Sequence, residues 1–129
     1  QIEEWKKEGV VEVAGFQDDM AKCMKHCSVV CLPSYREGLP KSLLEAASCG
    51  RPIVTTDVPG CREIVQDGVN GYLVPSKDPY LLAEALSRLL ADKKLREIMG
   101  LKGREFVERG FSAEIVAIKT EKIWSNLLN

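Results

Sequence analysis

A short apolar run that leads directly into a turn and a helix constrains this chain more than any other feature. Residues 29–34 (VVCLPS) are rich in β-branched side chains and end in Pro and Ser, which is typical of a strand covered on both faces in a parallel sheet. The chain must then turn. Gly38 permits backbone conformations that other residues avoid, and Pro40 suits the first position of a helix, where its missing N–H would have no partner. The segment therefore predicts a strand, a turn and a helix that begins at about Pro40.

The predicted helix has an apolar side and a polar side. Residues spaced three and four apart share one side of a helix, so the apolar side carries Leu43, Leu44 and Ala47, and the polar side carries Lys41, Glu45 and Ser48. Gly50 is a natural end for this helix, because glycine commonly follows a helix C-terminus. We therefore expect the leucines to pack on the sheet and Glu45 to face outward.

Short apolar runs alternate with helical segments along most of the 129 residues. The predicted strands are 10–16, 29–34, 52–57 and 71–74. The predicted helices are 18–26, 40–50, 61–66, 78–91, 93–109 and 113–128. Such alternation predicts one α/β domain over residues 1–129, with a parallel sheet, helices on both faces and a helical C-terminal part from about residue 78 to 129.

The start of the helix at Pro40 is a candidate phosphate site. A helix N-terminus at the carboxyl end of a parallel strand presents backbone N–H groups and a partial positive charge. A diphosphate there would contact the backbone of Leu39, Lys41 and Ser42. Glu37 would then lie near the group attached to the phosphates, and Glu45 would accept hydrogen bonds from vicinal hydroxyls such as those of a ribose. The arrangement favours a sugar nucleotide.

A purely structural interpretation stays open on spacing alone. Strand, turn and helix recur in every α/β protein, and Lys41 with Glu45 also fits a surface ion pair that contributes about 0.3 to 0.5 kcal/mol.

Several sequence blocks carry a resemblance to a known family. Glu37 and Glu45 are separated by seven residues, and Gly38 follows the first Glu. The further blocks are residues 13–16, 30–34, 43–46, 49–57, 59–65, 70–75 and 78–79. Over roughly residues 10 to 110 the chain resembles the C-terminal nucleotide-sugar-binding domain of the retaining GT-B glycosyltransferases (glycosyl transferases group 1 type), which has a Rossmann-like sheet.

The resemblance implies a role for each motif residue. Glu37 would contact the donor sugar as the catalytic residue, and Glu45 would hold the ribose. The diphosphate would be bound at the helix start, by Gly38, Leu39, Lys41 and Ser42. Many family members have Gly where Pro40 stands, so an amide contact at that position is lost here. The motif is most similar to those of bacterial surface-polysaccharide transferases, which typically use a UDP-sugar and a polyprenyl-diphosphate-linked acceptor.

The resemblance also implies that the chain is the larger part of one half of a transferase. Family members carry an acceptor-binding domain and further donor-domain strands before this point, so we expect no transfer by the chain alone, because transfer needs an acceptor held against the anomeric carbon. Two alternatives stay open at this point. One is a non-catalytic nucleotide-sugar-binding or assembly module, and the other is a nucleotide-sugar epimerase of the same architecture.

Composition excludes some classes of partner. A net charge of −1 gives no bulk attraction to nucleic acid. The absence of a long apolar run or a secretory leader favours a cytoplasmic protein, with attachment at the inner face of a membrane left to other parts of the intact protein. The five cysteines lack paired metal-site spacing, and no Asp-x-Asp motif occurs, so neither a metal nor another cofactor is expected.

Overall fold

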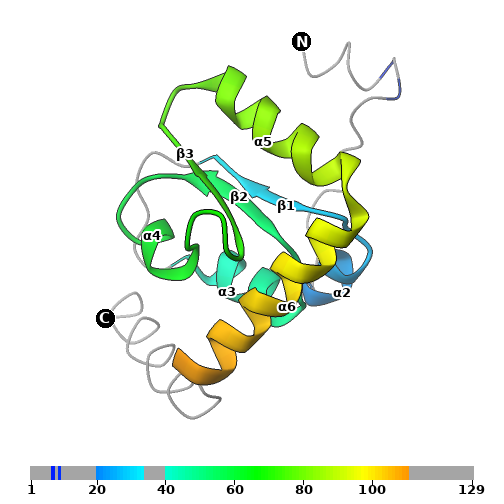
Figure 1. Cartoon of the computed structure of the whole chain (residues 1–129), viewed down its shortest axis with the longest axis vertical. Coiled ribbons are helices and arrows are strands. Elements are labelled where there is room, and N and C mark those ends of the chain that lie inside the picture. Colours follow the sequence, from blue (N-terminus) through cyan, green and yellow to red (C-terminus); the bar gives the residue numbers. More distant parts are fainter. Residues whose placement is uncertain (1–6, 8, 10–19, 34–39, 111–129) are drawn as a thin grey trace.

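The computed structural model describes residues 7, 9, 20–33 and 40–110. Its centre is a sheet of three parallel strands in the order β1-β2-β3. The strands are β1 (Val30–Leu32), β2 (Ile53–Thr56) and β3 (Gly71–Val74). They alternate with α2 (Met20–Lys25), α3 (Lys41–Ser48), α4 (Cys61–Ile64), α5 (Pro79–Ala91) and α6 (Lys93–Gly110). In Figure 1, α5 crosses above the strands and α3 lies below them.

The register of the sheet sorts its side chains onto two faces. Cys31 pairs with Val54, which pairs with Tyr72, and residues in register in a parallel sheet point to the same side. Val54 and Tyr72 pack with Ala85 and Leu89 of α5, so we call this side the α5 face. The opposite side carries Ile53 and packs against α3. The predicted parallel sheet with helices on both faces is confirmed.

Short-range bonds explain where the helices begin and end. Asp78 caps α5 by accepting a hydrogen bond from the Leu81 amide at 3.0 Å, and Asp92 caps α6 in the same way through the Leu95 amide. Arg96 donates to the carbonyls of Leu89 and Leu90, at 2.7 and 2.8 Å. The guanidinium therefore joins the end of α5 to the first turn of α6.

The motif helix ends as its glycine predicts. Gly50 has a φ of 70° and donates to the Ala47 carbonyl, while the Arg51 amide reaches back to the Ala46 carbonyl, both at 3.0 Å. These two bonds form a Schellman motif. Arg51 also donates to the carbonyls of Met24 and Lys25 at the end of α2, which fixes α2 against the start of β2.

Helix α6 crosses the amino edge of the sheet, where Gly50 and Asn70 precede β2 and β3. Its Met99 packs on the α5 face, and its Val107 packs with α3 on the other. The crossing is close because Gly100 lies on Gly50: a Cβ atom at residue 100 would be 2.0 Å from the Gly50 carbonyl oxygen. One helix thus joins the two cores.

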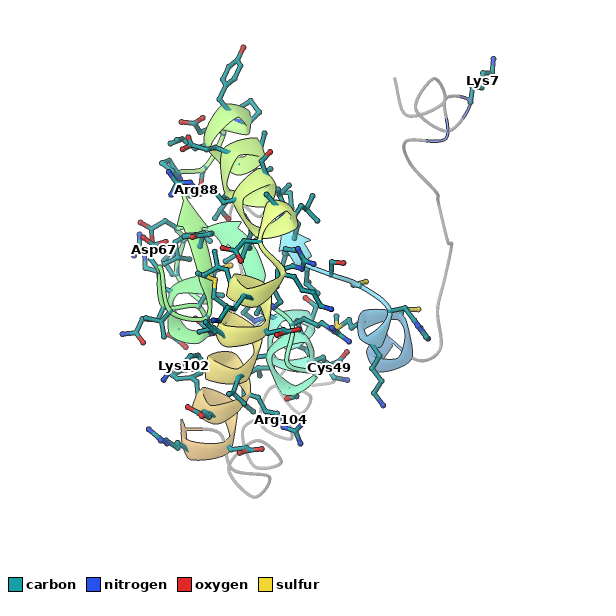
Figure 2. The ribbon with its side chains drawn as sticks, turned by 45° about the vertical axis from the view of Figure 1, so that its right-hand side comes forward. Lys7, Cys49, Asp67, Arg88, Lys102 and Arg104 are labelled. Carbon is teal, nitrogen blue, oxygen red and sulfur yellow. The ribbon has the colours of Figure 1, made fainter. Side chains whose placement is uncertain are left out.

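The outer side of β3 is occupied by the loop before it. The Asp67 carboxylate accepts a hydrogen bond from the Leu73 amide at 2.9 Å, and the Gly68 amide donates to the Gly71 carbonyl at 2.8 Å. Figure 2 shows Asp67 at this side of the molecule, near Arg88 of α5. The loop therefore takes up backbone groups that an edge strand would otherwise present to another strand.

Most predicted elements are confirmed, with shifts at their ends. Helix α3 begins at Lys41, one residue later than expected, with Pro40 as its N-cap, and β1 is shorter than the predicted strand. Helix α4 ends at Ile64 and not at residue 66, because the Asn70 side chain takes the Ile64 carbonyl and the Gln66 amide, at 2.9 and 2.7 Å. The strand expected at 10–16 and the helix expected at 113–128 lie outside the described residues.

The expectation that β1 is covered on both faces is wrong. Cys31 points to the α5 face and is exposed. The physical reason is the position of α5, which packs on β2 and β3, away from the β1 end of the sheet.

Candidate functional site

The start of α3 lies at the carboxyl edge of the sheet, the edge where β1, β2 and β3 end at Leu32, Thr56 and Val74. Pro40 is buried and extended, with φ −71° and ψ 109°, and its carbonyl accepts bonds from the amides of Leu43 and Leu44 at 3.1 and 3.3 Å. These bonds begin the helix, so the N–H of Ser42 in the first turn points along the helix axis toward its open end. The geometry presents a positive dipole end just beyond β1.

Glu45 faces outward from the second turn of this helix. Its side chain is 30% exposed, and its Oε1 atom lies 3.7 Å from Nζ of Lys41, whose side chain is 59% exposed. Leu43, Ala46 and Ala47 on the other side are fully buried. The predicted division of the helix is confirmed, and it leaves the Glu45 carboxylate able to accept further hydrogen bonds from a ligand.

The first half of the predicted site lies outside the described residues. This applies to Glu37, Gly38 and Leu39. Lys41, Ser42 and Glu45 are described, and the structure brings them together on the first two turns of α3. The roles of all six remain predictions.

Thr55 is a site-supporting residue that sequence reasoning missed. It is fully buried in β2, and its hydroxyl donates to the Leu32 carbonyl at 2.8 Å. The Cys61 sulfur lies 3.3 Å from the same hydroxyl, where its thiol hydrogen can be donated to the oxygen. The bond holds the last residue of β1, just before the motif turn, and the Thr-Thr pair at positions 55 and 56 was read from the sequence only as β-branched strand.

Two further features share the carboxyl edge. Arg62 of α4 forms an ion pair with Asp57, with Nε and Oδ1 2.5 Å apart, and also donates to the Asp57 carbonyl. On the α5 face, a cavity of about 410 Å³ opens between the strand ends and the start of α5. Its walls are formed by Pro33, Thr56, Val74, Pro75, Lys77, Asp78, Pro79 and Leu82. The edge therefore combines a helix N-terminus with a hollow.

The five thiols are free, and they do not gather into a metal site among the described residues. Cys61 is fully buried, and Cys49 is half-buried at the end of α3, where Figure 2 labels it. Cys31 is exposed, although neighbouring atoms desolvate its sulfur enough to raise the pKa of the thiol. Their environments are those of structural thiols and not of activated ones.

Comparison with known proteins identifies the family. The family described as "Glycosyl transferases group 1" matches residues 1–106. The chain belongs to this family. The match includes both glutamates of the motif and the strand that precedes them.

Curated relatives include enzymes of bacterial glycan synthesis. An N,N'-diacetylbacillosaminyl-diphospho-undecaprenol alpha-1,3-N-acetylgalactosaminyltransferase of Campylobacter jejuni is 39% identical over 93 residues, which are 72% of this chain and 25% of that enzyme. The capsular polysaccharide biosynthesis glycosyltransferase CapM of Staphylococcus aureus is 34% identical over 101 residues, which are 78% of this chain and 27% of that protein. The chain thus spans only about a quarter of the length of these relatives.

Solved structures show the same fold. A sucrose-phosphate synthase of Thermosynechococcus elongatus is 31% identical, with a TM-score of 0.83 over 98% of this chain and 32% of that protein. A mutant of TarM from S. aureus, in complex with UDP and other ligands, is 29% identical, with a TM-score of 0.83 over 99% of this chain and 25% of that protein. These neighbours are GT-B glycosyltransferases, and the chain corresponds to a fragment of them.

These matches confirm the resemblance, the α/β fold and the assignment to glycosyltransferases. Among the described residues, no helix is long and apolar enough to cross a membrane.

Proposed function

We propose that this chain is the donor-binding part of a retaining glycosyltransferase, which transfers a sugar from a nucleotide sugar to a glycan or a lipid-linked acceptor. The observation that carries the proposal is the start of α3 at the carboxyl end of β1, with Glu45 facing outward beside it. A neighbour of the same fold is in complex with UDP, which favours a UDP-sugar as the donor.

The proposed chemistry follows from the charge that develops during transfer. As the bond between the sugar and the diphosphate breaks, positive charge grows on the sugar ring and negative charge on the leaving diphosphate. The N-terminus of α3, with Lys41 and Ser42, stabilises the diphosphate. Glu37 positions the sugar and stabilises its ring charge, and Glu45 orients the ribose through its hydroxyls. Gly38 and Leu39 complete the backbone around the phosphates.

The acceptor would be held by a part of the intact transferase that this chain does not include, since the chain spans about a quarter of its relatives. A relative's name specifies a diphospho-undecaprenol acceptor, which favours a polyprenyl-diphosphate-linked acceptor presented at the cytoplasmic face of a membrane. The chain alone would bind donor without transferring sugar.

Calorimetric titration tests the donor site. UDP, GDP and their sugar derivatives are titrated into the chain and into Glu45→Ala, under one salt condition. Removal of the ribose contacts is expected to weaken nucleotide binding by about tenfold, the loss of one charge-assisted hydrogen bond or two neutral ones. Glu108→Ala is the matched control, because Glu108 also forms an exposed i,i+4 pair, with Arg104 at 3.2 Å, on a helix remote from the motif.

The outcomes separate the candidate functions. Equal affinity of Glu45→Ala and the unmodified chain contradicts the assigned ribose contact. Product analysis of the intact protein then decides the class: a sugar joined to an acceptor supports transfer, a changed sugar supports an epimerase, and binding without turnover supports a non-catalytic module.

A further inference from the structure

The α5 face of β1 is bare where a parallel sheet is normally covered. Parallel strands are almost always buried on both faces. Helix α3 covers β1 on one side through Leu43 and Leu44. On the other side Cys31 is exposed, and Pro33, which points the same way two residues later, is exposed as well. The uncovered area therefore lies at the centre of the strand and continues toward its carboxyl end.

The cavity at the carboxyl edge is continuous with this bare surface. Pro33 forms part of the cavity wall, and the neighbouring wall residue Leu82 belongs to the apolar cluster that also includes Val29. Val29 and Leu82 are only partly buried. An apolar surface thus runs from Val29 past Cys31 into a hollow of about 410 Å³ beside α5.

The shape and chemistry of this surface fit a protein element more closely than a polar ligand. Its floor and walls are mainly Val, Leu, Pro and Cys side chains, and its charged groups, Lys77 and Asp78, lie together at one end. The element must fit beside α5 on the same face of a parallel sheet. An amphipathic helix does so in α/β folds, because its apolar stripe covers the strand while its polar side faces solvent.

We propose that the intact protein covers the α5 face of β1 with an amphipathic helix from a segment outside this chain, packed beside α5 and against Cys31, Pro33 and Leu82. The length of the relatives supports this source, because they are about four times as long as the matched region. The inference rests on the part of the proposed function that makes this chain a piece of a larger transferase, and it is independent of donor and acceptor.

Thiol labelling tests the cover without altering the protein. The 129-residue chain and the intact protein receive a short pulse of N-ethylmaleimide, and peptide mass spectrometry measures modification of each cysteine separately. Cys31 reports on the proposed interface. Cys27 is exposed near the amino edge and serves as the accessible control, and the fully buried Cys61 reports global unfolding. Each cysteine is compared with itself, because the raised pKa of Cys31 slows its labelling in both proteins.

The expected result is that Cys31 is labelled at least about tenfold more slowly in the intact protein, since labelling then needs local opening, while Cys27 is labelled at a similar rate in both. In the intact protein, Leu82→Ala is expected to speed the labelling of Cys31 and leave Cys61 protected. Equal labelling of Cys31 in the two proteins overturns the proposal. Protection already present in the isolated chain also overturns it: if dilution abolishes that protection a second copy is the cover, and otherwise the chain's own residues are. Neither result bears on donor binding, which the calorimetric titration measures.

Discussion

The two edges of the sheet are built in opposite ways. At the amino edge, α6 crosses so closely that Gly50 and Gly100 lie backbone to backbone, and the buried side chain of Asn70 bonds to two backbone groups. At the carboxyl edge, the same three strands end beside a hollow, the exposed Lys41–Glu45 pair and the open end of α3. The amino edge is packed for stability, and the carboxyl edge keeps polar groups and space for ligands.

This difference predicts that substitutions at the two edges act on different quantities. Changes at the amino edge should lower the free energy of unfolding and leave nucleotide affinity per folded molecule unchanged. Changes at the carboxyl edge should do the reverse, because exposed polar groups contribute little to stability.

The largest effect is expected for Gly100→Ala. A Cβ atom at this position would lie 2.0 Å from the Gly50 carbonyl oxygen, so α6 must move away from the sheet and both cores must repack. We expect the free energy of unfolding to fall by about 3 kcal/mol, measured by urea denaturation. Gly110→Ala is the control, because a Cβ atom there meets open space. An unchanged urea midpoint in Gly100→Ala would show that the two backbones are not in close contact.

Asn70→Ala should cost somewhat less. The substitution leaves the Ile64 carbonyl and the Gln66 amide without their side-chain partner in a largely buried turn. We expect a loss of about 2 kcal/mol in the free energy of unfolding, again by urea denaturation. Gln66→Ala removes only an exposed side chain and should be close to neutral. If both variants lose the same stability, the side-chain bonds of Asn70 are not the cause.

Thr55→Val tests the connection between the two properties. Valine keeps the buried volume, but the Leu32 carbonyl loses its 2.8 Å hydrogen bond, so the end of β1 is held less firmly. We expect a loss of about 1 kcal/mol in stability together with weaker nucleotide binding by calorimetry. Thr55→Ser, which keeps the hydroxyl, should restore the affinity. Unchanged affinity in Thr55→Val would mean that the motif turn does not depend on this bond.

Lys41→Ala should have the smallest effect on stability. The pair with Glu45 spans 3.7 Å and is largely solvated, so we expect a change within about 0.5 kcal/mol by thermal or urea unfolding. Nucleotide affinity should fall, and more at low salt than at high salt, because a cation beside the diphosphate is removed. Equal affinities at both salt concentrations would contradict the placement of the diphosphate near Lys41.

The sequence predicted the elements at the carboxyl edge because their signals are local. The amphipathic pattern of residues 41–48, the glycine after it and the Asp78-Pro79 start of α5 each act within one or two helical turns. The basic residues of α6 are exposed as expected, and Figure 2 labels Lys102 and Arg104 on that helix. Arg96 differs, because it is partly buried and bonds to the end of α5.

The amino edge could not be predicted, because its contacts join distant parts of the chain. Gly50 and Gly100 are fifty positions apart, and neither has a sequence pattern that indicates the other. The early end of α4 depends on a side chain six residues later. The bare face of β1 was missed for a related reason: an apolar run indicates that a strand will be covered, but not whether the covering element belongs to the same segment of chain.

The loop at Asp67 gives the sheet a direction of growth. With the Leu73 amide and the Gly71 carbonyl already bonded to that loop, β3 is a terminated end, in the sense in which a capped polymer no longer adds monomers. Extra strands of a longer chain, or the edge of a colliding molecule, meet there a surface that is poorly able to continue the hydrogen-bond ladder. A family built on this half-domain can therefore add strands beyond β1 while its opposite border stays fixed.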